Sequence, residues 1–374
     1  MSQAPLLTTS AEVADLARSL SKHPVIAVDL EGDSMHSYQE KVCLLQFSWG
    51  EETVLVDPVA GADLSPLQEP LADPDMCKIF HAADYDIRCL ARDFSIKIRG
   101  LFDTMIAAQL LGEPRVGLGD ILHKYFGVEM DKQYQRADWS KRPISAPMLH
   151  YAAEDTRYLE DLMGILRRSL EEKERLWWAE EEFRLLEQVR FAPPQGPACL
   201  QVKGAAALNP RQLEVLEQLL SWRNAKARKR DYPVYKVMSN KALLALAAAM
   251  PRSEAQLDKV DGVPPKLRQR HAGIILECVT SALERPQEEL PVPPQRRRRE
   301  VDPAAEERFK RLKQWRSRKA QELELDPGIL VNNSILSRIA YLQPRHCVEL
   351  EQIEGMRNWQ RQVLGPELVA ELRS

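Results

Sequence analysis

The first half of the chain alternates between short apolar runs and stretches with helical periodicity. Residues 25–28 form an apolar run with two valines and an isoleucine, which is typical of a buried strand. Residues 42–48 and 53–57 are two further apolar stretches, and their short connection predicts a hairpin. Residues 78–81 and 101–104 predict two more short strands.

Segments with an apolar face at helical spacing lie between these strands. Residues 10–20 place Val13, Leu16, Ala17 and Leu20 on one face behind a Thr/Ser cap, which predicts a helix before the first strand. Helices are also predicted over residues 82–94, 105–111, 118–126 and 146–190. Strands that first follow one another and then alternate with helices predict an α/β fold with a mixed sheet flanked by helices.

The second half predicts helices only. Residues 191–197 (FAPPQGP) break the α/β pattern, and residues 286–302 are rich in proline and arginine, so both are predicted linkers. The helical blocks on either side of the second linker share one layout: a long basic helix, a proline-containing break, a short helix, and an acidic stretch that reaches Gly262 or Gly355. This repeat predicts two duplicated all-α domains.

These patterns divide the chain into an α/β domain over residues 1–195, a helical domain over 205–285, a linker over 286–302 and a second helical domain over 303–374. Because the predicted α/β core is complete before the first linker, we expect residues 1–195 to fold alone.

Composition points to an intracellular protein. No apolar run approaches the roughly 20 residues that cross a bilayer, and the N-terminus lacks the features of a signal peptide. The six cysteines are scattered, without a C-x-x-C pair or a histidine at zinc spacing, so we expect buried thiols in a reducing compartment. The predicted location is the cytoplasm, with no membrane contact and no obligatory protein partner.

The small net charge of −3 conceals two halves of opposite charge. Residues 1–200 contain 21 Lys and Arg against 33 Asp and Glu, whereas residues 201–374 contain 31 against 22. An acidic half indicates a cation site, and a basic half indicates a polyanionic ligand, although charge also varies along ordinary surfaces.

Paired carboxylates end the first predicted buried strand. Asp29 and Glu31 are two residues apart, so on a strand they point to the same side. Two like charges this close favour a cation between them, and oxygen ligands suit Mg²⁺ or Mn²⁺. A polar strand end before a turn is the alternative for this stretch alone.

Two further segments offer acids with ambiguous roles. Asp84 and Asp86 follow a strand and open a helix, where either could act as a cap. Tyr151 and Asp155 are four residues apart on one face of a predicted helix whose continuation is apolar, and His150 is adjacent. An aspartate on such a face is costly to bury unless it is ligated or paired.

Together these segments resemble the ribonuclease D family of DEDD 3′→5′ exonucleases. The matching pieces, in order, are VDLE at 28–31, HAADYDI at 81–87, FDT at 102–104, DWSKRP at 138–143 and YAAED at 151–155. The downstream blocks resemble the paired HRDC domains of bacterial ribonuclease D. The resemblance covers about residues 25–365 and implies a ribonuclease H-like fold for the first domain.

The resemblance assigns the catalytic residues. It implies that Asp29, Glu31, Asp86 and Asp155 bind two divalent cations, Mg²⁺ or Mn²⁺, roughly 3.5–4 Å apart. These ions would activate the attacking water and stabilise the leaving 3′-oxygen. Tyr151 matches the subclass in which a tyrosine orients the attacking water, although His150 stands where the other subclass has a histidine. Adjacent helical residues point about 100° apart, so only Tyr151 shares the face of Asp155.

Basic and aromatic residues are candidate RNA contacts. In the α/β domain they are His81, Trp139, Lys141 and Arg142, and in the first helical domain Arg223, Lys226, Arg228, Lys229 and Arg230. Arg296 to Arg299 extend this basic track. The alternatives are a buried tryptophan, solvated cations, and cations that favour a helix C-terminus. Gly32 follows the D-x-E motif where many family members have an aromatic residue, which puts terminal-base contacts in doubt.

The resulting prediction is a metal-dependent 3′→5′ exoribonuclease that acts on RNA with a free 3′ end, with tRNA precursors as the expected substrates. A DNA 3′→5′ exonuclease is the first alternative, because the same four acids can serve DNA. A catalytically inactive RNA-binding protein is the second, and the complete set of acids argues against it.

Overall fold

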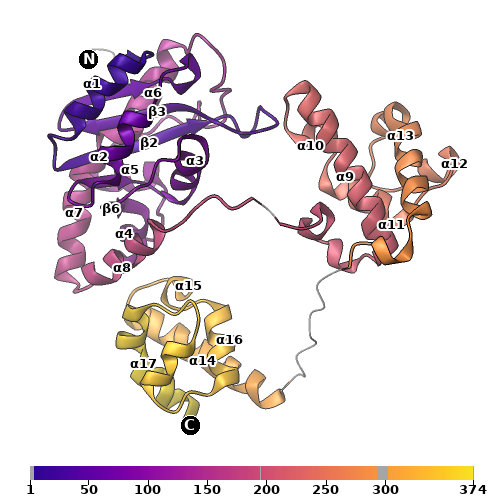
Figure 1. Cartoon of the computed structure of the whole chain (residues 1–374). Coiled ribbons are helices and arrows are strands. Elements are labelled where there is room, and N and C mark those ends of the chain that lie inside the picture. The colour runs from indigo at the N-terminus through magenta and orange to yellow at the C-terminus, as the bar shows by residue number, and fades with distance from the viewer. Residues whose placement is uncertain (1–3, 194, 293–301, 374) are drawn as a thin grey trace. The chain divides into compact units, whose positions relative to one another are not determined.

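The computed structural model describes residues 4–193, 195–292 and 302–373, which form two compact units (Figure 1). Unit 1 comprises Met1–Gly32, Val42–Phe191 and Arg298–Ser374, and unit 2 comprises Asp33–Lys41 and Ala192–Arg297. No helix in the described part of the chain is both long enough and apolar enough to span a bilayer. All six cysteines are free thiols, but Cys347 is exposed rather than buried.

Unit 1 is built on a six-stranded mixed sheet. The strands are β1 (Leu6–Leu7), β2 (Val25–Gly32), β3 (Val42–Trp49), β4 (Glu52–Val56), β5 (Cys77–Phe80) and β6 (Leu101–Asp103), in the order β1-β4-β3-β2-β5-β6. The predicted hairpin is present, since β3 is antiparallel to both β2 and β4. The remaining neighbours are parallel. The predicted mixed α/β fold is therefore confirmed, while the two-residue strand β1 was missed.

Helices cover both faces of this sheet. They are α1 (Ser10–Leu20), α2 (Gln68–Ala72), α3 (Asp84–Phe94), α4 (Thr104–Leu111), α5 (Leu118–Phe126), α6 (Ala146–Arg157), α7 (Leu159–Glu172) and α8 (Leu176–Leu186). The stretch over 146–190, predicted to be largely helical, is divided into three helices. Glu174, between α7 and α8, has a left-handed backbone with φ of 57°, which a continuous helix excludes.

Two helical blocks of the same layout follow. Unit 2 contains α9 (Pro210–Arg230), α10 (Val234–Val237), α11 (Asn240–Ala249), α12 (Glu254–Leu257) and α13 (Pro265–Glu284) around its own apolar core. The C-terminal block contains α14 (Pro303–Glu322), α15 (Pro327–Leu330), α16 (Asn333–Leu342) and α17 (Asn358–Arg373). The predicted repeat is therefore present in the structure. Most of the predicted linker over 286–302 lies outside the described residues.

The C-terminal block shares one core with the sheet domain. Trp359 at the start of α17 stacks on Trp178 of α8 with ring centroids 4.5 Å apart and an interplanar angle of 8°. Its indole Nε1 donates to Glu182 Oε1 at 3.0 Å, and its main-chain N–H donates to Glu181 Oε2 at 2.9 Å. Residues 1–195 alone would expose the Trp178 ring, so we no longer expect them to fold independently with full stability.

Candidate active site

The central strand β2 presents the first two carboxylates. Asp29 lies opposite Gln46 of β3, and Glu31 lies opposite Leu44, so both carboxylates face the side of the sheet that α6 covers. The intervening Leu30 points to the opposite face and is buried there in the apolar core. The alternating pattern of β2 therefore delivers two acids to one face of the sheet.

Helix α3 brings a third carboxylate from the neighbouring strand. β5 is parallel to β2, and α3 begins four residues after β5 ends. Asp86, in the first turn of α3, is buried, whereas Asp84 is exposed and forms an ion pair with Arg88 at 2.9 Å. The pKa of Asp86 is raised by its burial and by the charge of Asp29. Of the two candidates, Asp86 is thus the acid that faces β2.

Helix α6 supplies the fourth carboxylate and the tyrosine. Tyr151 and Asp155 are each 9% exposed, on the face of α6 that packs against the sheet. Thr156 Oγ1 lies 2.6 Å from Ser48 Oγ of β3, which anchors the helix to the sheet. His150 is exposed. The structure therefore brings Tyr151, not His150, to the three acids.

Burial raises the pKa of all four carboxylates, and the charges of neighbouring acids raise it further at Glu31, Asp86 and Asp155. Burial, followed by the charges of Asp29, Asp155 and Asp86, raises the pKa of Glu31 to about 10. Burial raises the pKa of Asp29 to about 7 and, together with the charge of Asp29, the pKa of Asp155 to about 8. No basic side chain contributes to any of these shifts. Full ionisation at neutral pH therefore requires cations from outside the chain.

The donor set suits hard divalent cations. It consists of carboxylate oxygens only, which Mg²⁺ and Mn²⁺ prefer. Both amide atoms of the buried Gln46 side chain, opposite Asp29, lack a hydrogen-bond partner in the protein, and a hydrated cation would supply partners for both. Among the described residues, no three acidic, histidine or cysteine side chains are grouped closely enough to hold one ion.

The environment of Tyr151 keeps its phenol protonated. Burial, and then the charges of Asp155, Glu31, Asp29 and Asp131, raise the pKa of its phenol well above the usual value. The side-chain hydrogen bond with Asp155 favours the ionised carboxylate. A protonated phenol that donates to Asp155 keeps its oxygen lone pairs free to accept a hydrogen bond from water.

Asp103 organises the turn that presents Asp86. Its buried carboxylate accepts hydrogen bonds from the main-chain N–H groups of Ala82 at 3.2 Å, Ala83 at 2.8 Å, Met105 at 2.9 Å and Ile106 at 3.1 Å. Ala82 has a left-handed φ of 66°, which is costly for alanine. Asp103 therefore holds a strained turn from the neighbouring strand. The FDT motif marked this position in the sequence without showing its role.

Two predicted RNA contacts in unit 1 are structural instead. Trp139 is 1% exposed and packs near Tyr151, so its ring cannot stack on a base. Arg142 forms a bidentate ion pair with Asp57, with both distances 2.6 Å, and also donates to the carbonyl oxygen of Cys43. These contacts hold the segment before α6 to β3 and to the residue that follows β4. Lys141 is exposed and remains a candidate contact.

His81 is partly buried and held by Thr104. The Thr104 hydroxyl donates to the Phe80 carbonyl at 3.0 Å and lies 2.9 Å from His81 Nδ1. A hydrogen bond with the backbone of Val116 also acts on this imidazole. Burial lowers the pKa of this imidazole, so it is neutral at pH 7. An RNA contact through His81 remains a prediction.

The basic residues of α9 in unit 2 have different environments. Arg223 is buried and donates to the Met238 carbonyl at 3.2 Å and to Asn240 Oδ1 at 2.6 Å, so the prediction that it contacts RNA is wrong. The Arg228 guanidinium lies 5.3 Å from the centroid of the Tyr38 ring. Lys229 and Arg230 are exposed and Lys226 is partly buried. Arg296 to Arg299 lie outside the described residues.

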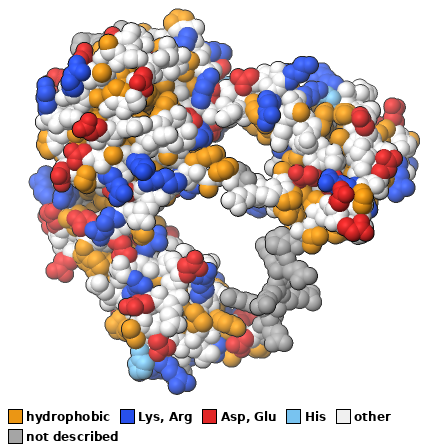
Figure 2. All heavy atoms as spheres, viewed as in Figure 1, with side chains coloured by type: hydrophobic (Ala, Val, Ile, Leu, Met, Phe, Trp, Pro, Cys, Tyr) orange, Lys and Arg blue, Asp and Glu red, His pale blue; other side chains and the backbone are white. Residues whose placement is uncertain are grey.

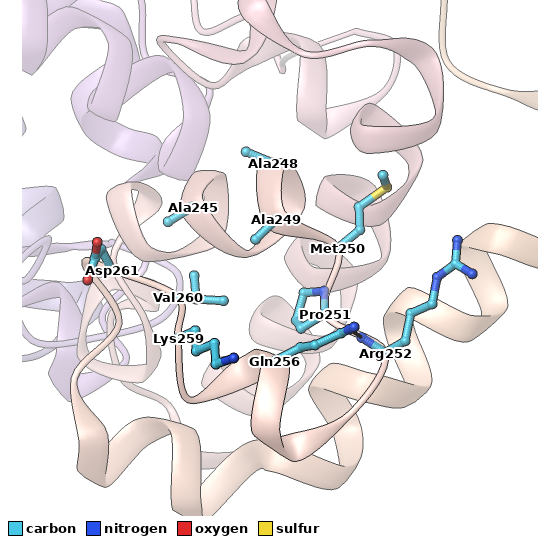
Figure 3. Close-up of a pocket in the computed structure, with 10 residues that line it drawn as sticks. All are labelled: Ala245, Ala248, Ala249, Met250, Pro251, Arg252, Gln256, Lys259, Val260 and Asp261. Carbon is cyan, nitrogen blue, oxygen red and sulfur yellow. Dashed lines mark hydrogen bonds between the residues drawn. The ribbon is translucent and has the colours of Figure 1, made fainter.

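A separate hollow of about 810 Å³ lies in unit 2 (Figure 3). The end of α11 and the segment around α12 form it, with Ala245, Met250, Arg252 and Lys259 among its lining residues. Asp261 is the one acidic residue in the lining. Because a single carboxylate cannot hold two cations, this hollow does not have the chemistry for phosphodiester hydrolysis.

Paired substitutions test the assignment of the neighbouring candidates. Tyr151→Phe is expected to slow RNA cleavage about a hundredfold, because the attacking water loses its orientation. His150→Gln, at an exposed position, is expected to leave the rate near that of the wild type. In a second pair, Asp86→Asn is expected to slow RNA cleavage in the same way, whereas Asp84→Asn is expected to leave the rate near that of the wild type. Single-turnover cleavage rates on one RNA compare the four variants. An inactive His150→Gln variant would show that His150, not Tyr151, orients the attacking water.

Comparisons with known proteins agree with this geometry. Residues 6–171 match a family model described as a 3′-5′ exonuclease, and residues 212–279 and 305–372 each match the HRDC domain. The chain is 33% identical over 295 residues to ribonuclease D of Escherichia coli K12, covering 77% of each protein. It is 29% identical to ribonuclease D of Gluconacetobacter diazotrophicus, over 98% of this chain and 92% of that protein.

Solved structures show the same likeness. A crystal structure of Escherichia coli RNase D, described as an exoribonuclease involved in structured RNA processing, matches with a TM-score of 0.76 and 27% identity, over 100% of this chain and 99% of that one. The catalytic core of RRP6 from Trypanosoma brucei matches with a TM-score of 0.64 and 31% identity, over 75% and 79%.

Proposed function

The chain belongs to the ribonuclease D family and is a 3′→5′ exoribonuclease, and we propose that Asp29, Glu31, Asp86 and Asp155 hold two divalent cations for this reaction. The observation that carries the proposal is the convergence of four acids whose pKa values are all raised, by burial first, with no basic side chain contributing to the shifts. Mg²⁺ and Mn²⁺ both suit this all-oxygen site.

The reaction is hydrolysis of the terminal phosphodiester at the RNA 3′ end. Water adds to phosphorus, the bond from phosphorus to the leaving 3′-oxygen breaks, and a nucleoside 5′-monophosphate is released. Asp29, Glu31, Asp86 and Asp155 would hold divalent cations, which would supply positive charge for the phosphoryl oxygens and the leaving oxygen. Tyr151 orients the water, and Asp103 holds the turn that positions Asp86.

Structured RNAs are the proposed substrates. The Escherichia coli relative of known structure is described as acting in structured RNA processing, and two HRDC domains follow the exonuclease domain here. We propose that the chain trims 3′ extensions of tRNA precursors in the cytoplasm. The relatives' names favour RNA over DNA, and the proposed mechanism requires no obligatory protein partner.

Parallel digestion of RNA and DNA tests this function. Single-stranded RNA and DNA of one sequence, labelled at the 5′ end, are incubated with Mg²⁺, Mn²⁺ or EDTA. The expected result is stepwise shortening of RNA from its 3′ end with either metal and no shortening in EDTA. Full activity in EDTA would refute the metal site, and faster digestion of DNA would favour the DNA exonuclease.

A further inference from the structure

The first HRDC block contains a lysine enclosed by two rings. Lys226 Nζ lies 3.3 Å from Nδ1 and 3.5 Å from Nε2 of His271, and 5.8 Å from the centroid of the Trp222 ring. The rings of Trp222 and His271 meet edge to face, with centroids 5.1 Å apart and an interplanar angle of 65°. His271, on α13, is 6% exposed, and Lys226 is partly buried on α9.

The side chains whose charges shift the pKa of Lys226 are both cationic. Arg230 on α9 and Arg270 on α13 act on both Lys226 and His271, and each lowers the pKa of both groups. No carboxylate contributes to either shift, and the structure shows no ion pair for these four residues within its described part. We call Trp222, Lys226, Arg230, Arg270 and His271 the α9–α13 cluster. Figure 2 shows Lys and Arg side chains and a histidine gathered at the upper end of this helical block.

The C-terminal block also has a tryptophan and a lysine at these helix positions, but there carboxylates neutralise the charge of the lysine. Trp315 and Lys319 of α14 occupy the positions that Trp222 and Lys226 occupy in α9. Here, however, Glu367 of α17 accepts from Trp315 Nε1 at 3.1 Å and from Lys319 Nζ at 2.7 Å. Glu322 accepts from Lys319 at 2.9 Å. One repeat therefore pairs this lysine with two carboxylates, and the other surrounds it with cations.

We propose that the α9–α13 cluster is a binding site for phosphodiester groups of the RNA substrate, and that the matching position of the C-terminal block is not. Grouped cations without a counter-charge repel one another, so a polyanion gains free energy by binding there. Phosphates also displace condensed counterions when they meet lysine and arginine. This inference rests on the proposed action on structured RNA and assigns its recognition to the first HRDC block.

Protonation of His271 should make the affinity of the site for RNA depend on pH. Its pKa lies below the usual value because of burial and then the charges of Lys226, Arg270 and Arg230, so the free imidazole is neutral at pH 7. A bound phosphate favours the charged imidazole, which raises the pKa in the complex. Affinity is therefore expected to rise as pH falls from 7.5 towards 5.5, with uptake of a proton.

Charge reversal in the full-length protein tests the site. Lys226→Glu and Arg270→Glu are compared with Lys203→Glu, which makes the same charge change at an exposed lysine that contributes to neither pKa shift. Binding of a tRNA-like RNA is measured across a salt series with Ca²⁺ in place of Mg²⁺ to suppress cleavage. Each lost phosphate contact should reduce the slope of log K against log salt by about 0.7–0.9. We expect this reduction for the two cluster variants only.

Three further variants separate binding from folding. Arg270 is exposed, so Arg270→Gln tests the site even if Lys226→Glu unfolds. His271→Gln should remove the rise in affinity at low pH while leaving affinity at pH 8 almost unchanged. Lys319→Ala, in the neutralised repeat, should leave the salt slope unchanged. Wild-type slopes for Arg270→Gln and Arg270→Glu would overturn the proposal and leave the cluster as a surface for an acidic protein.

The same variants distinguish this proposal from the exonuclease mechanism. Degradation of a short unstructured RNA by the wild-type protein tests the exonuclease mechanism, whereas binding of the tRNA-like RNA by the variants tests the cluster. If the wild type fails on that substrate, the proposed function fails. If only the binding differences are absent, the site proposal alone fails.

Discussion

Asp29→Asn is expected to lower the rate of RNA hydrolysis by about a thousandfold or more, while the fold survives. Asp29 lies on the central strand and acts on the pKa of Glu31, Asp86 and Asp155, so its loss weakens the site for both cations. Metal ions contribute several kcal/mol to stabilising charge in the transition state, and each 1.36 kcal/mol is tenfold in rate. Single-turnover cleavage of labelled RNA in saturating Mg²⁺ measures the loss.

Thermal unfolding provides a second readout for this variant. Without metal, Asp29→Asn should be at least as stable as the wild type, because it removes repulsion among the acids. A cation at a hundred times its Kd should stabilise the wild type by about 2.7 kcal/mol and the variant by much less. Asp84→Asn, at an exposed acid, is the control. Wild-type cleavage by Asp29→Asn would be incompatible with the two-cation site.

Trp359→Ala is expected to reduce the free energy of unfolding of unit 1 by about 3–5 kcal/mol, the usual cost of truncating a buried tryptophan. Trp359 is 1% exposed, stacks on Trp178, and donates through its indole to Glu182. Its removal leaves a cavity where α17 meets α8. Because α8 also packs on α4 and β6, the loss should lower the melting temperature of the exonuclease domain itself.

Trp177→Ala is the matched control for that experiment. Trp177 precedes Trp178 on α8 but is 38% exposed, so its truncation removes less buried surface. Denaturant unfolding of both variants compares them directly, and hydrogen exchange in α8 shows where stability is lost. An exonuclease domain that unfolds at the wild-type midpoint in Trp359→Ala would mean that the C-terminal block stabilises only itself.

The linear pattern was sufficient to predict every strand except β1, most helices, and the positions of the acids on β2 and α6. Alternation along residues 25–32 places Asp29 and Glu31 on one face, and four-residue spacing places Tyr151 with Asp155. Both relationships are local, so they follow from strand and helix periodicity alone. The choice between Asp84 and Asp86 came from family resemblance, and burial supplies its physical reason: one acid pairs with Arg88 in solvent and the other faces β2.

Other roles depend on partners that are distant in the sequence. In the sequence, Trp139 and Arg142 are candidate substrate contacts. In the structure, Trp139 packs near Tyr151 and Arg142 pairs with Asp57. The side-chain amide of Gln46 has no hydrogen-bond partner in the protein. It points to a ligand at the acidic site only because the register of the sheet places it opposite Asp29. Such pairings are set by strand register and packing, which single-chain periodicity does not specify.

The sequence by itself determined the α/β class, the duplicated helical blocks and the acids on β2 and α6, since periodicity and spacing are local properties of the chain. Only the tertiary structure decided how the two blocks differ. Lys226 and Lys319 stand in similar basic helices, but Glu367 of α17 reaches only the second. Likewise, Trp359 joins the C-terminal block to α8 through contacts between residues far apart in the chain. Charge compensation and core formation depend on which side chains meet in space, and folding alone brings those partners together.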